Sequence, residues 1–240
     1  VGHNRELDQR AFELLDHVVT VSQNSLNSLC ELHPTCSDKF KCIHLPALMD
    51  YDSMTARSLE PNCMDEEKDT VKILCVGRLV ELKGFHLCVE PCRKLLDKGY
   101  NIKWYVAGEG SYRPVMEELI KQHHLEDRFI LLGNCPNPYS YIRSADICVQ
   151  PSRYEGFSLS VIEGKFFKKP MVVSDIPSNM EMIKDGYNGL IVERNPKAIY
   201  KAVERLVSDE KLRKELGENP SLVEISNEKI MKDFIDLFSK

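Results

Sequence analysis

Two cationic side chains, Arg78 and Lys83, stand five residues apart in a turn that begins at Gly77 and ends at Gly84. The turn follows an apolar run and leads into residues with helical spacing. Helix N-termini favour anions, and two added positive charges would hold a phosphate or a diphosphate there. Gly84 lets the backbone come close at the start of the helix. The segment therefore predicts an anion site, and a solvated basic loop is the competing interpretation.

Two carboxylates, Glu155 and Glu163, follow a second apolar run. Glu155 stands in the loop before a predicted helix, and Glu163 stands on the first turns of that helix. A carboxylate accepts two hydrogen bonds, so it suits the vicinal hydroxyls of a sugar or a ribose. Hydroxyls and free backbone N–H groups from Ser158 to Ser160 add an anion site at the helix start. The alternatives are a solvated loop for Glu155 and a capping box of Ser160 with Glu163.

Two further loops follow other apolar runs. Gly108-Glu109-Gly110 is a tight glycine turn, but position 113 is Arg, so the GxGxxG fingerprint is absent and a nicotinamide dehydrogenase is disfavoured. The loop 133–139 contains two prolines and is expected to be rigid. Its backbone polar groups could recognise the edge of a nucleobase, although a plain connecting loop explains it equally well.

All four loops belong to a regular alternation of strand-like runs and helical segments, which predicts right-handed βαβ units and a doubly wound parallel sheet. Short, continuously apolar strands fit a sheet that helices cover on both faces. Ligands of such sheets bind beyond the carboxyl ends of the strands, where the four loops stand. The predicted strands are 71–77, 102–108, 129–133, 145–151, 170–174 and 189–192, and the predicted helices are 84–98, 112–124, 138–144, 158–168 and 177–184.

The flanks of this region carry different patterns. Residues 5–17 and 23–33 have helical spacing, and a short strand is expected between them from Val18 to Val21. Residues 34–69 show little periodicity and indicate a linker or a domain boundary. The tail is expected to form helices near 196–207, 209–216 and 227–239.

The composition is that of an ordinary globular protein. Of 240 residues, 42% are hydrophobic and 29% are charged, which disfavours disordered and fibrous classes. The net charge of −5 disfavours a basic nucleic-acid surface and a polybasic membrane patch. No apolar run approaches the roughly 18 residues of a spanning helix, and the N-terminus has no apolar signal core.

The nine cysteines fit reduced thiols in a cytosolic protein. Zinc is disfavoured because no CxxC pair occurs in the cluster Cys30, His33, Cys36, Cys42 and His44.

Five motifs in register resemble the C-terminal domain of glycosyltransferase family 4. They are GRLVELKG, GEG, ADICVQPSRYEGFSLSVIE, KPMVVSD and DGYNGLIV, in this order within residues 71–192. The strongest element is a pair of Glu separated by seven residues, here Glu155 and Glu163, after a Pro-Ser at a strand end. The family has the GT-B fold, in which two Rossmann-like domains face each other across a cleft. The resemblance implies that this chain carries the donor-binding half.

The resemblance also implies a role for each matching residue. Arg78 and Lys83 would bind the donor diphosphate and stabilise the leaving group, and Glu155 would contact hydroxyls of the transferred sugar, so these three are the catalytic candidates. Glu163 would hold the ribose hydroxyls. The other donor-binding candidates are Gly77 beside Arg78, Asn134 and Cys135 in the base-binding loop, Gly156, Phe157 and Ser158 along the sugar, and Leu159 and Ser160 at a phosphate. Family members are generally retaining and need no catalytic metal. No metal site or cofactor is therefore expected, and the nucleotide-sugar donor, most commonly a UDP-sugar, is a substrate.

The departures from the family pattern concern packing and domain content. The family run Glu-Ala-x-Ala-x-Gly-x-Pro is replaced at 163–170 by Glu-Gly-Lys-Phe-Phe-Lys-Lys-Pro, which should alter helix packing but not the Glu pair. The family's Asn-Gly before the linker is replaced at 45–48 by Leu-Pro-Ala-Leu. Most of an N-terminal domain is absent from 240 residues. We expect a remnant of that acceptor domain at 1–50, a linker at 51–70, the Rossmann-like donor domain at 71–192 and C-terminal helices at 193–240.

Together these features predict the donor-binding half of a retaining hexosyltransferase, which binds a nucleotide sugar but transfers little by itself. A glycan or lipid-linked acceptor, as in polysaccharide or lipopolysaccharide biosynthesis, would be held by the missing domain. The alternative is a non-catalytic nucleotide-sugar-binding module or a subunit of a split enzyme. A sugar-nucleotide epimerase would need further acid–base residues on the donor side and is disfavoured. The expected location is the cytoplasm, with peripheral attachment at the inner membrane face as an open alternative.

Overall fold

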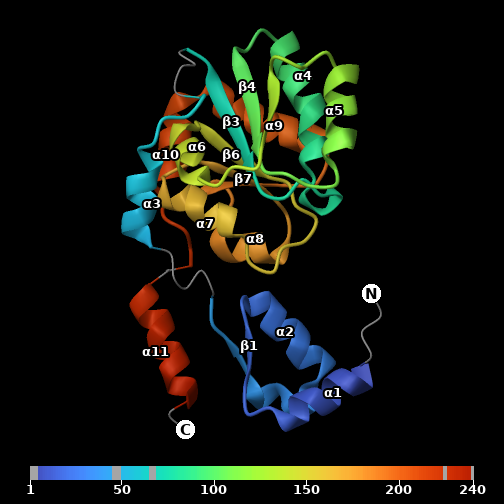
Figure 1. Ribbon diagram of the computed structural model, residues 1–240, viewed down its shortest axis with the longest axis vertical. Helices are drawn as coiled ribbons and strands as arrows, with labels where there is room; N and C mark the ends of the chain where they lie inside the picture. Colours follow the sequence, from blue (N-terminus) through green and yellow to red (C-terminus); the bar gives the residue numbers. More distant parts are fainter. Residues whose placement is uncertain (1–4, 45–49, 65–68, 224–225, 239–240) are drawn as a thin grey trace. The chain divides into compact units, whose positions relative to one another are not determined.

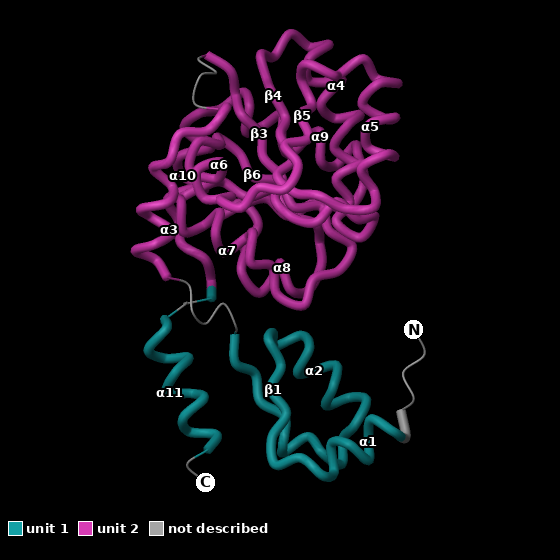
Figure 2. The backbone as a smooth tube through the Cα atoms, viewed as in Figure 1, with its two compact units in different colours: residues 1–49, 223–240 teal, residues 50–222 magenta. Residues whose placement is uncertain are grey.

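The computed structural model (Figure 1) describes residues 5–44, 50–64, 69–223 and 226–238. The chain divides into two compact units, shown in separate colours in Figure 2. Unit 1 comprises residues 1–49 and 223–240, and unit 2 comprises residues 50–222. The replaced segment 45–48 lies outside the described residues.

Unit 2 is built on a six-stranded sheet with the strand order β5-β4-β3-β6-β7-β8. Every neighbouring pair is parallel. The chain therefore runs outward from β3 to β5, returns to the centre, and runs outward again from β6 to β8. The direction reverses between β3 and β6, and ligand sites of open α/β sheets lie at such a switch point. The strands are β3 (Val71–Val76), β4 (Ile102–Ala107), β5 (Phe129–Gly133), β6 (Ile147–Gln150), β7 (Met171–Ser174) and β8 (Gly189–Val192).

Helices cover both faces of this sheet, so the predicted fold class is confirmed. Helices α4 and α5 lie on one side of the sheet, and α6 and α7 lie on the other (Figure 1). Trp104 of β4 is fully buried in the core and stacks on Phe129 with ring centroids 5.9 Å apart. The helices of unit 2 are α3 (Tyr51–Ser58), α4 (Val89–Asp97), α5 (Arg113–Gln122), α6 (Pro138–Ser144), α7 (Leu159–Phe166), α8 (Pro177–Met182), α9 (Pro196–Ser208) and α10 (Glu210–Glu218).

Helix α3 occupies part of the segment that the sequence predicted as a linker. Asp50 caps it, because its side chain accepts a hydrogen bond from the backbone N–H of Ser53. Only Met54 and Ser58 are buried along the helix, which is too few for a visible apolar stripe. Contacts with α6 and not a local pattern define this helix. Residues 65–68 of the predicted linker lie outside the described residues.

Unit 1 contains a two-stranded parallel sheet that pairs β1 (Val18–Thr20) with β2 (Phe40–Cys42). Its helices are α1 (Arg5–Leu14), α2 (Gln23–Leu32) and α11 (Asn227–Phe238). Phe12 of α1 packs edge-to-face on Phe40, with centroids 5.2 Å apart. The predicted strand and helices of this region are therefore present, with small differences at their ends.

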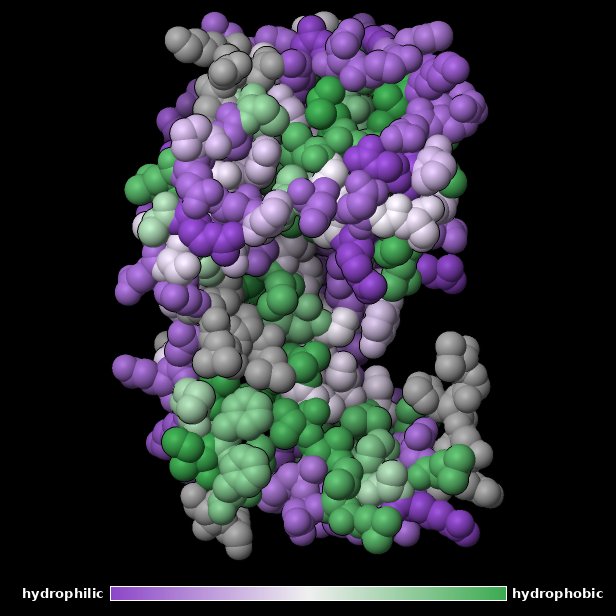
Figure 3. Space-filling model, in the orientation of Figure 1, coloured by the Kyte–Doolittle hydropathy of each residue, from purple (hydrophilic) through white to green (hydrophobic). Residues whose placement is uncertain are grey.

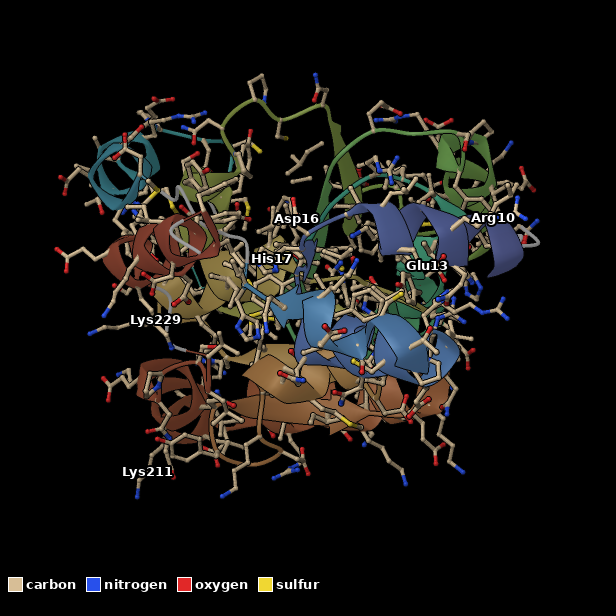
Figure 4. The ribbon with its side chains drawn as sticks, turned by 90° about the horizontal axis from the view of Figure 1, so that it is seen from below. Arg10, Glu13, Asp16, His17, Lys211 and Lys229 are labelled. Carbon is tan, nitrogen blue, oxygen red and sulfur yellow. The ribbon has the colours of Figure 1, made fainter. Side chains whose placement is uncertain are left out.

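The two units differ in what they expose. In unit 2 the surface over α4 and α5 is dominated by hydrophilic residues (Figure 3). In unit 1 apolar residues gather on the face seen in Figure 3, and Leu14 of α1 and Phe238 of α11 are each 87% exposed. Arg10 and Glu13, labelled in Figure 4, are exposed charged side chains on α1. Unit 1 therefore leaves large apolar side chains uncovered by the described residues.

Candidate functional site

A pocket of about 480 Å³ opens at the carboxyl ends of β3 and β6, where the strand order reverses. It is therefore placed where the topology predicts a ligand site. Both predicted cations and both predicted carboxylates line it. The lining residues are Val76, Gly77, Arg78, Val80, Leu82, Lys83, Tyr154, Glu155, Gly156, Phe157, Leu159, Ser160 and Glu163.

The loop after β3 brings Lys83 against the loop after β6. Lys83 ends a single 3₁₀ turn, and Gly84 follows it with φ 72°. A Cβ atom at Gly84 would lie 2.3 Å from the carbonyl oxygen of Pro151, so only glycine allows the two loops to approach this closely. This close approach places the Lys83 ammonium beside the residues that follow β6.

The predicted segment 84–98 is helical, but its first turn is a 3₁₀ turn. Gly84 stands at the N-cap of this turn, Phe85–Cys88, which leads directly into α4 at Val89. A helix start therefore follows Arg78 and Lys83 as predicted, although residues 85–88 are not among the described residues that line the pocket. The positive charge at this side of the pocket comes from the two side chains themselves. Arg78 is exposed, and its guanidinium has no hydrogen-bond partner among the described residues.

Glu155 also lines the pocket and is held by three donors. Lys83 Nζ lies 2.6 Å from Glu155 Oε1 in an ion pair, with side chains that are 17% and 11% exposed respectively. Ser152 Oγ donates to the same oxygen at 2.7 Å, and Gln150 Nε2 donates to it at 3.2 Å. Glu155 is therefore a fixed carboxylate and not a solvated loop residue.

Glu163 projects into the pocket from α7. The helix is capped at Ser158, so Ser160 lies inside it and cannot form a capping box with Glu163. The capping interpretation is therefore wrong. Burial raises the pKa of the Glu163 carboxyl to about 7. No described residue hydrogen-bonds to this carboxyl, which leaves both of its oxygens available to a ligand.

Three predicted donor-binding residues do not line the pocket: Asn134, Cys135 and Ser158. Ser158 is buried at the start of α7, where its Oγ lies 3.2 Å from Ser160 Oγ. Asn134 and Cys135 lie in the loop after β5, at the edge of the sheet. Burial raises the pKa of the Cys135 thiol.

The loop after β5 is attached to helix α3. Arg57 donates to the carbonyl of Pro136 and lies 5.1 Å from the centre of the Tyr139 ring. Asn137 donates in return to the Arg57 carbonyl at 2.8 Å and to Glu60 at 2.7 Å. These bonds agree with the rigidity expected for the loop.

The sequence reasoning missed Gln150 and Ser152 as functional residues. Both are buried and both bond Glu155. The signal for Ser152 was the Pro-Ser at the strand end, whereas Gln150 is hidden in an apolar strand.

Within the described ranges, no group of three or more His, Cys, Asp or Glu side chains could hold a metal ion. Nor does any described helix have the length and apolarity needed to cross a membrane.

Residues 61–221, which contain the whole sheet and the pocket, match the family model described as glycosyl transferases group 1. The chain belongs to this family. A protein of Methanocaldococcus jannaschii, named as an uncharacterized glycosyltransferase, is 32% identical over 206 residues, which cover 80% of this chain and 51% of that protein. The alpha-D-kanosaminyltransferase of Streptomyces kanamyceticus is 33% identical over 151 residues, or 61% of this chain and 39% of that enzyme. The chain thus spans about half the length of these group 1 relatives, or less.

Solved structures agree with the fold. The Anabaena protein HepE, solved with UDP and glucose, superposes with a TM-score of 0.86 over 99% of this chain and 67% of its own, at 15% identity. The C-terminal domain of the group 1 glycosyl transferase LpcC from Francisella tularensis gives a TM-score of 0.58 at 26% identity, over 68% of this chain and 85% of its own. These structural neighbours are GT-B glycosyltransferases, and the six-stranded sheet of this group 1 chain has the fold of one Rossmann-like domain of that architecture.

Proposed function

We propose that this chain binds a nucleoside-diphosphate sugar in the pocket between β3 and β6, as the donor-binding half of a retaining family 4 hexosyltransferase. The single observation that carries the proposal is the arrangement of two cations and two carboxylates around one pocket. Arg78 and Lys83 supply charge for a diphosphate, while Glu155 and Glu163 supply acceptors for hydroxyl groups. A nucleotide sugar presents both kinds of group.

The proposed chemistry needs positioning and charge stabilisation. When the sugar leaves the diphosphate, negative charge grows on the phosphate oxygens. Arg78 and Lys83 would stabilise that charge, so we propose transfer without a resident metal ion or other cofactor. Glu155 would hold hydroxyls of the transferred sugar, and Glu163 those of the ribose. Preorganised groups of this kind lower the barrier because they need not reorient during the reaction.

We propose UDP as the nucleotide and a glycan or a lipid-linked sugar as the acceptor. HepE was solved with UDP, which supports the nucleotide. A capsular polysaccharide biosynthesis glycosyltransferase of Staphylococcus aureus, 28% identical over 168 residues, supports the acceptor class. Acceptor contacts would come from the half of the relatives that this chain does not span.

Titration calorimetry with UDP, GDP, ADP and UDP-glucose tests the donor proposal. We expect one diphosphate to bind selectively, and Arg78→Ala and Glu163→Ala each to weaken it by roughly tenfold or more, since each removes a charge-assisted hydrogen bond. Arg205→Ala and Glu215→Ala, which change exposed residues of α9 and α10, are matched controls and should bind as the unmodified chain does. Absence of binding to all four compounds would refute the proposal.

A non-catalytic binding module is the second candidate, because every described residue that lines the pocket belongs to unit 2. Incubation of the chain with labelled UDP-sugar and a panel of sugar acceptors distinguishes the two. We expect donor binding with little transfer from this chain alone. Transfer that stays absent when the chain is supplied with the N-terminal half of a group 1 relative would favour the module.

A further inference from the structure

A chain of buried polar groups lies beneath Glu155. Ser152 and Gln150 are 0% and 1% exposed, and Gln150 Nε2 donates to Ser152 Oγ at 3.1 Å as well as to Glu155. The backbone carbonyl of Ser152 accepts a hydrogen bond from Ser174 Oγ at the end of β7. Asn179 of α8 donates to the Ser174 carbonyl at 2.9 Å. These hydrogen bonds therefore connect the Glu155 loop to β6, β7 and α8.

All donors to Glu155 meet the same carboxylate oxygen. Lys83, Ser152 and Gln150 all bond Oε1, and no described residue bonds Oε2. A carboxylate has about four lone-pair sites, so the second oxygen keeps its full capacity to accept. Because Glu155 lines the pocket, this arrangement presents an unshared oxygen to a ligand.

Lys83 has two anionic partners to satisfy. In the structure it pairs with Glu155, but the proposed donor would bring a diphosphate to the same ammonium group. An ammonium that moves toward the diphosphate weakens its bond to Glu155. A carboxylate held by Lys83 alone would then be free to rotate.

We propose that Gln150 and Ser152 are positioning residues, which keep the Glu155 carboxylate aimed at the sugar after Lys83 turns to the diphosphate. This inference rests on the proposed function. Both donors are neutral and buried, so an incoming phosphate does not compete for them as it does for a cation. Gln150 and Ser152 therefore determine how strongly the sugar contributes to donor affinity. The contribution of the diphosphate comes from Arg78 and Lys83.

The inference predicts a change in one ratio. That ratio is the affinity for a sugar nucleotide divided by the affinity for the matching nucleoside diphosphate. Ser152→Ala removes one donor to Oε1, and Gln150→Met removes the other with little change in volume. Each variant should lower the ratio by roughly tenfold, while the affinity for the diphosphate stays within about twofold. A merely structural role would weaken both ligands together.

Ser178→Ala is the matched control. Ser178 is a buried serine of α8, and its hydroxyl has no hydrogen-bond partner among the described residues. The control should leave the ratio unchanged. A double-mutant cycle adds a second test, because Ser152→Ala should have no further effect on the ratio when Glu155 is already alanine.

The experiment is calorimetry on the full chain with a nucleoside diphosphate and its matching sugar nucleotide. The pairs are UDP with UDP-glucose or UDP-N-acetylglucosamine, GDP with GDP-mannose, and ADP with ADP-glucose. The variants are measured with the pair that the unmodified chain binds. A lowered ratio in both Ser152→Ala and Gln150→Met, absent from Ser178→Ala, supports the inference. An unchanged ratio in a folded variant overturns it and leaves the proposed function standing. If Ser152→Ala does not fold, Gln150→Met decides. If the unmodified chain binds none of these nucleotides, both the proposed function and this inference are refuted.

Discussion

Glu163 combines a buried carboxyl with a place in the pocket, so its ionisation should control donor affinity. Burial raises its pKa to about 7. Only the ionised form accepts hydrogen bonds from both ribose hydroxyls. The affinity for a UDP-sugar should therefore rise by about tenfold between about pH 6 and pH 8, which calorimetry at several pH values would measure. A UDP-sugar suits this test because its diphosphate carries constant charge in that range.

Glu163→Gln is the control for this pH dependence and should bind with a flat profile. The same shift has an opposite effect on the unliganded protein. A carboxyl whose pKa is raised in the folded state binds more protons there than in the unfolded state, so the free energy of unfolding falls as pH rises from about 4.5 through about 7. A slope in affinity that persists in Glu163→Gln would assign the titration to another group.

Lys168 adopts a left-handed conformation, with φ 54°, directly after helix α7. The backbone N–H of Lys169 bonds the Gly164 carbonyl, and that of Lys168 bonds the Lys165 carbonyl, which together form a Schellman motif. Glycine stands at this position in the family run. Lys168→Gly should therefore stabilise the protein by roughly 0.5–1 kcal/mol. Chemical denaturation followed by the fluorescence of Trp104 would measure it.

The matched control for Lys168→Gly is Lys201→Gly, in an exposed and right-handed position within α9. There glycine should destabilise the protein by about 1 kcal/mol. Two substitutions of the same chemical type are thus expected to have opposite signs. Destabilisation by both would show that the backbone of Lys168 carries no strain.

At the scale of elements, Lys165 links the helix that carries Glu163 to the end of α10. Its buried ammonium donates to the carbonyls of Leu216 at 2.6 Å and Gly217 at 3.0 Å, and to Asn188 at 3.0 Å. Lys165→Met would leave these carbonyls without their donor, although it also removes a desolvated charge. We expect a net loss of about 2 kcal/mol in the free energy of unfolding.

Denaturant titration compares Lys165→Met with Lys214→Met, which removes an exposed lysine paired to Glu210 on the surface of α10. The control should stay within about 0.5 kcal/mol of the unmodified chain. The pKa of Lys165 is lowered to about 8, chiefly by burial. The unfolded state therefore binds more protons above that pH. This group's contribution to stability should rise with pH from about 8 to about 10.5 in the unmodified chain and in Lys214→Met, and should be absent from Lys165→Met. Equal losses in both variants would mean that the buried contacts of Lys165 add nothing.

Gly164, which replaces an alanine of the family run, packs close to another element of the fold. A Cβ atom at Gly164 would lie 2.5 Å from Met171 Sδ, so an alanine there would require the flexible end of the Met171 side chain to shift. The sequence showed that packing would change here, and the Glu pair is indeed retained in the pocket. It could not show which neighbour Gly164 faces, because Met171 belongs to another element.

For the whole molecule, the alternation of apolar strands and helical segments was enough to predict the sheet and its two covered faces. It also brought Arg78, Lys83, Glu155 and Glu163 to one edge, where they share a pocket. The bond between Lys83 and Glu155 joins residues 72 positions apart, and no local pattern encodes it. Helix α3 was not predicted because its stability also comes from long-range contacts, in this case with α6.

The division into units leads to a final prediction, that residues 50–222 fold and bind the donor without unit 1. The buried core cluster runs from Ile73 to Leu216, and the pocket lies within unit 2. The Francisella tularensis C-terminal domain was itself solved as a separate domain. Unit 1, in contrast, leaves Leu14 and Phe238 exposed, and none of its described residues lines the pocket.

The fragment 50–222 should unfold in one transition, which the single tryptophan, buried in its core, would report. Its affinity for the donor should stay within roughly threefold of the full chain, because an independent core fixes all the lining side chains. A folded fragment that has lost the donor would show that unit 1 contributes to the site. A fragment without a cooperative transition would show that the core of unit 2 depends on residues outside it. Retained folding and binding would place donor recognition wholly in unit 2, so that any partner domain would be needed only for the acceptor and for closing the reaction site.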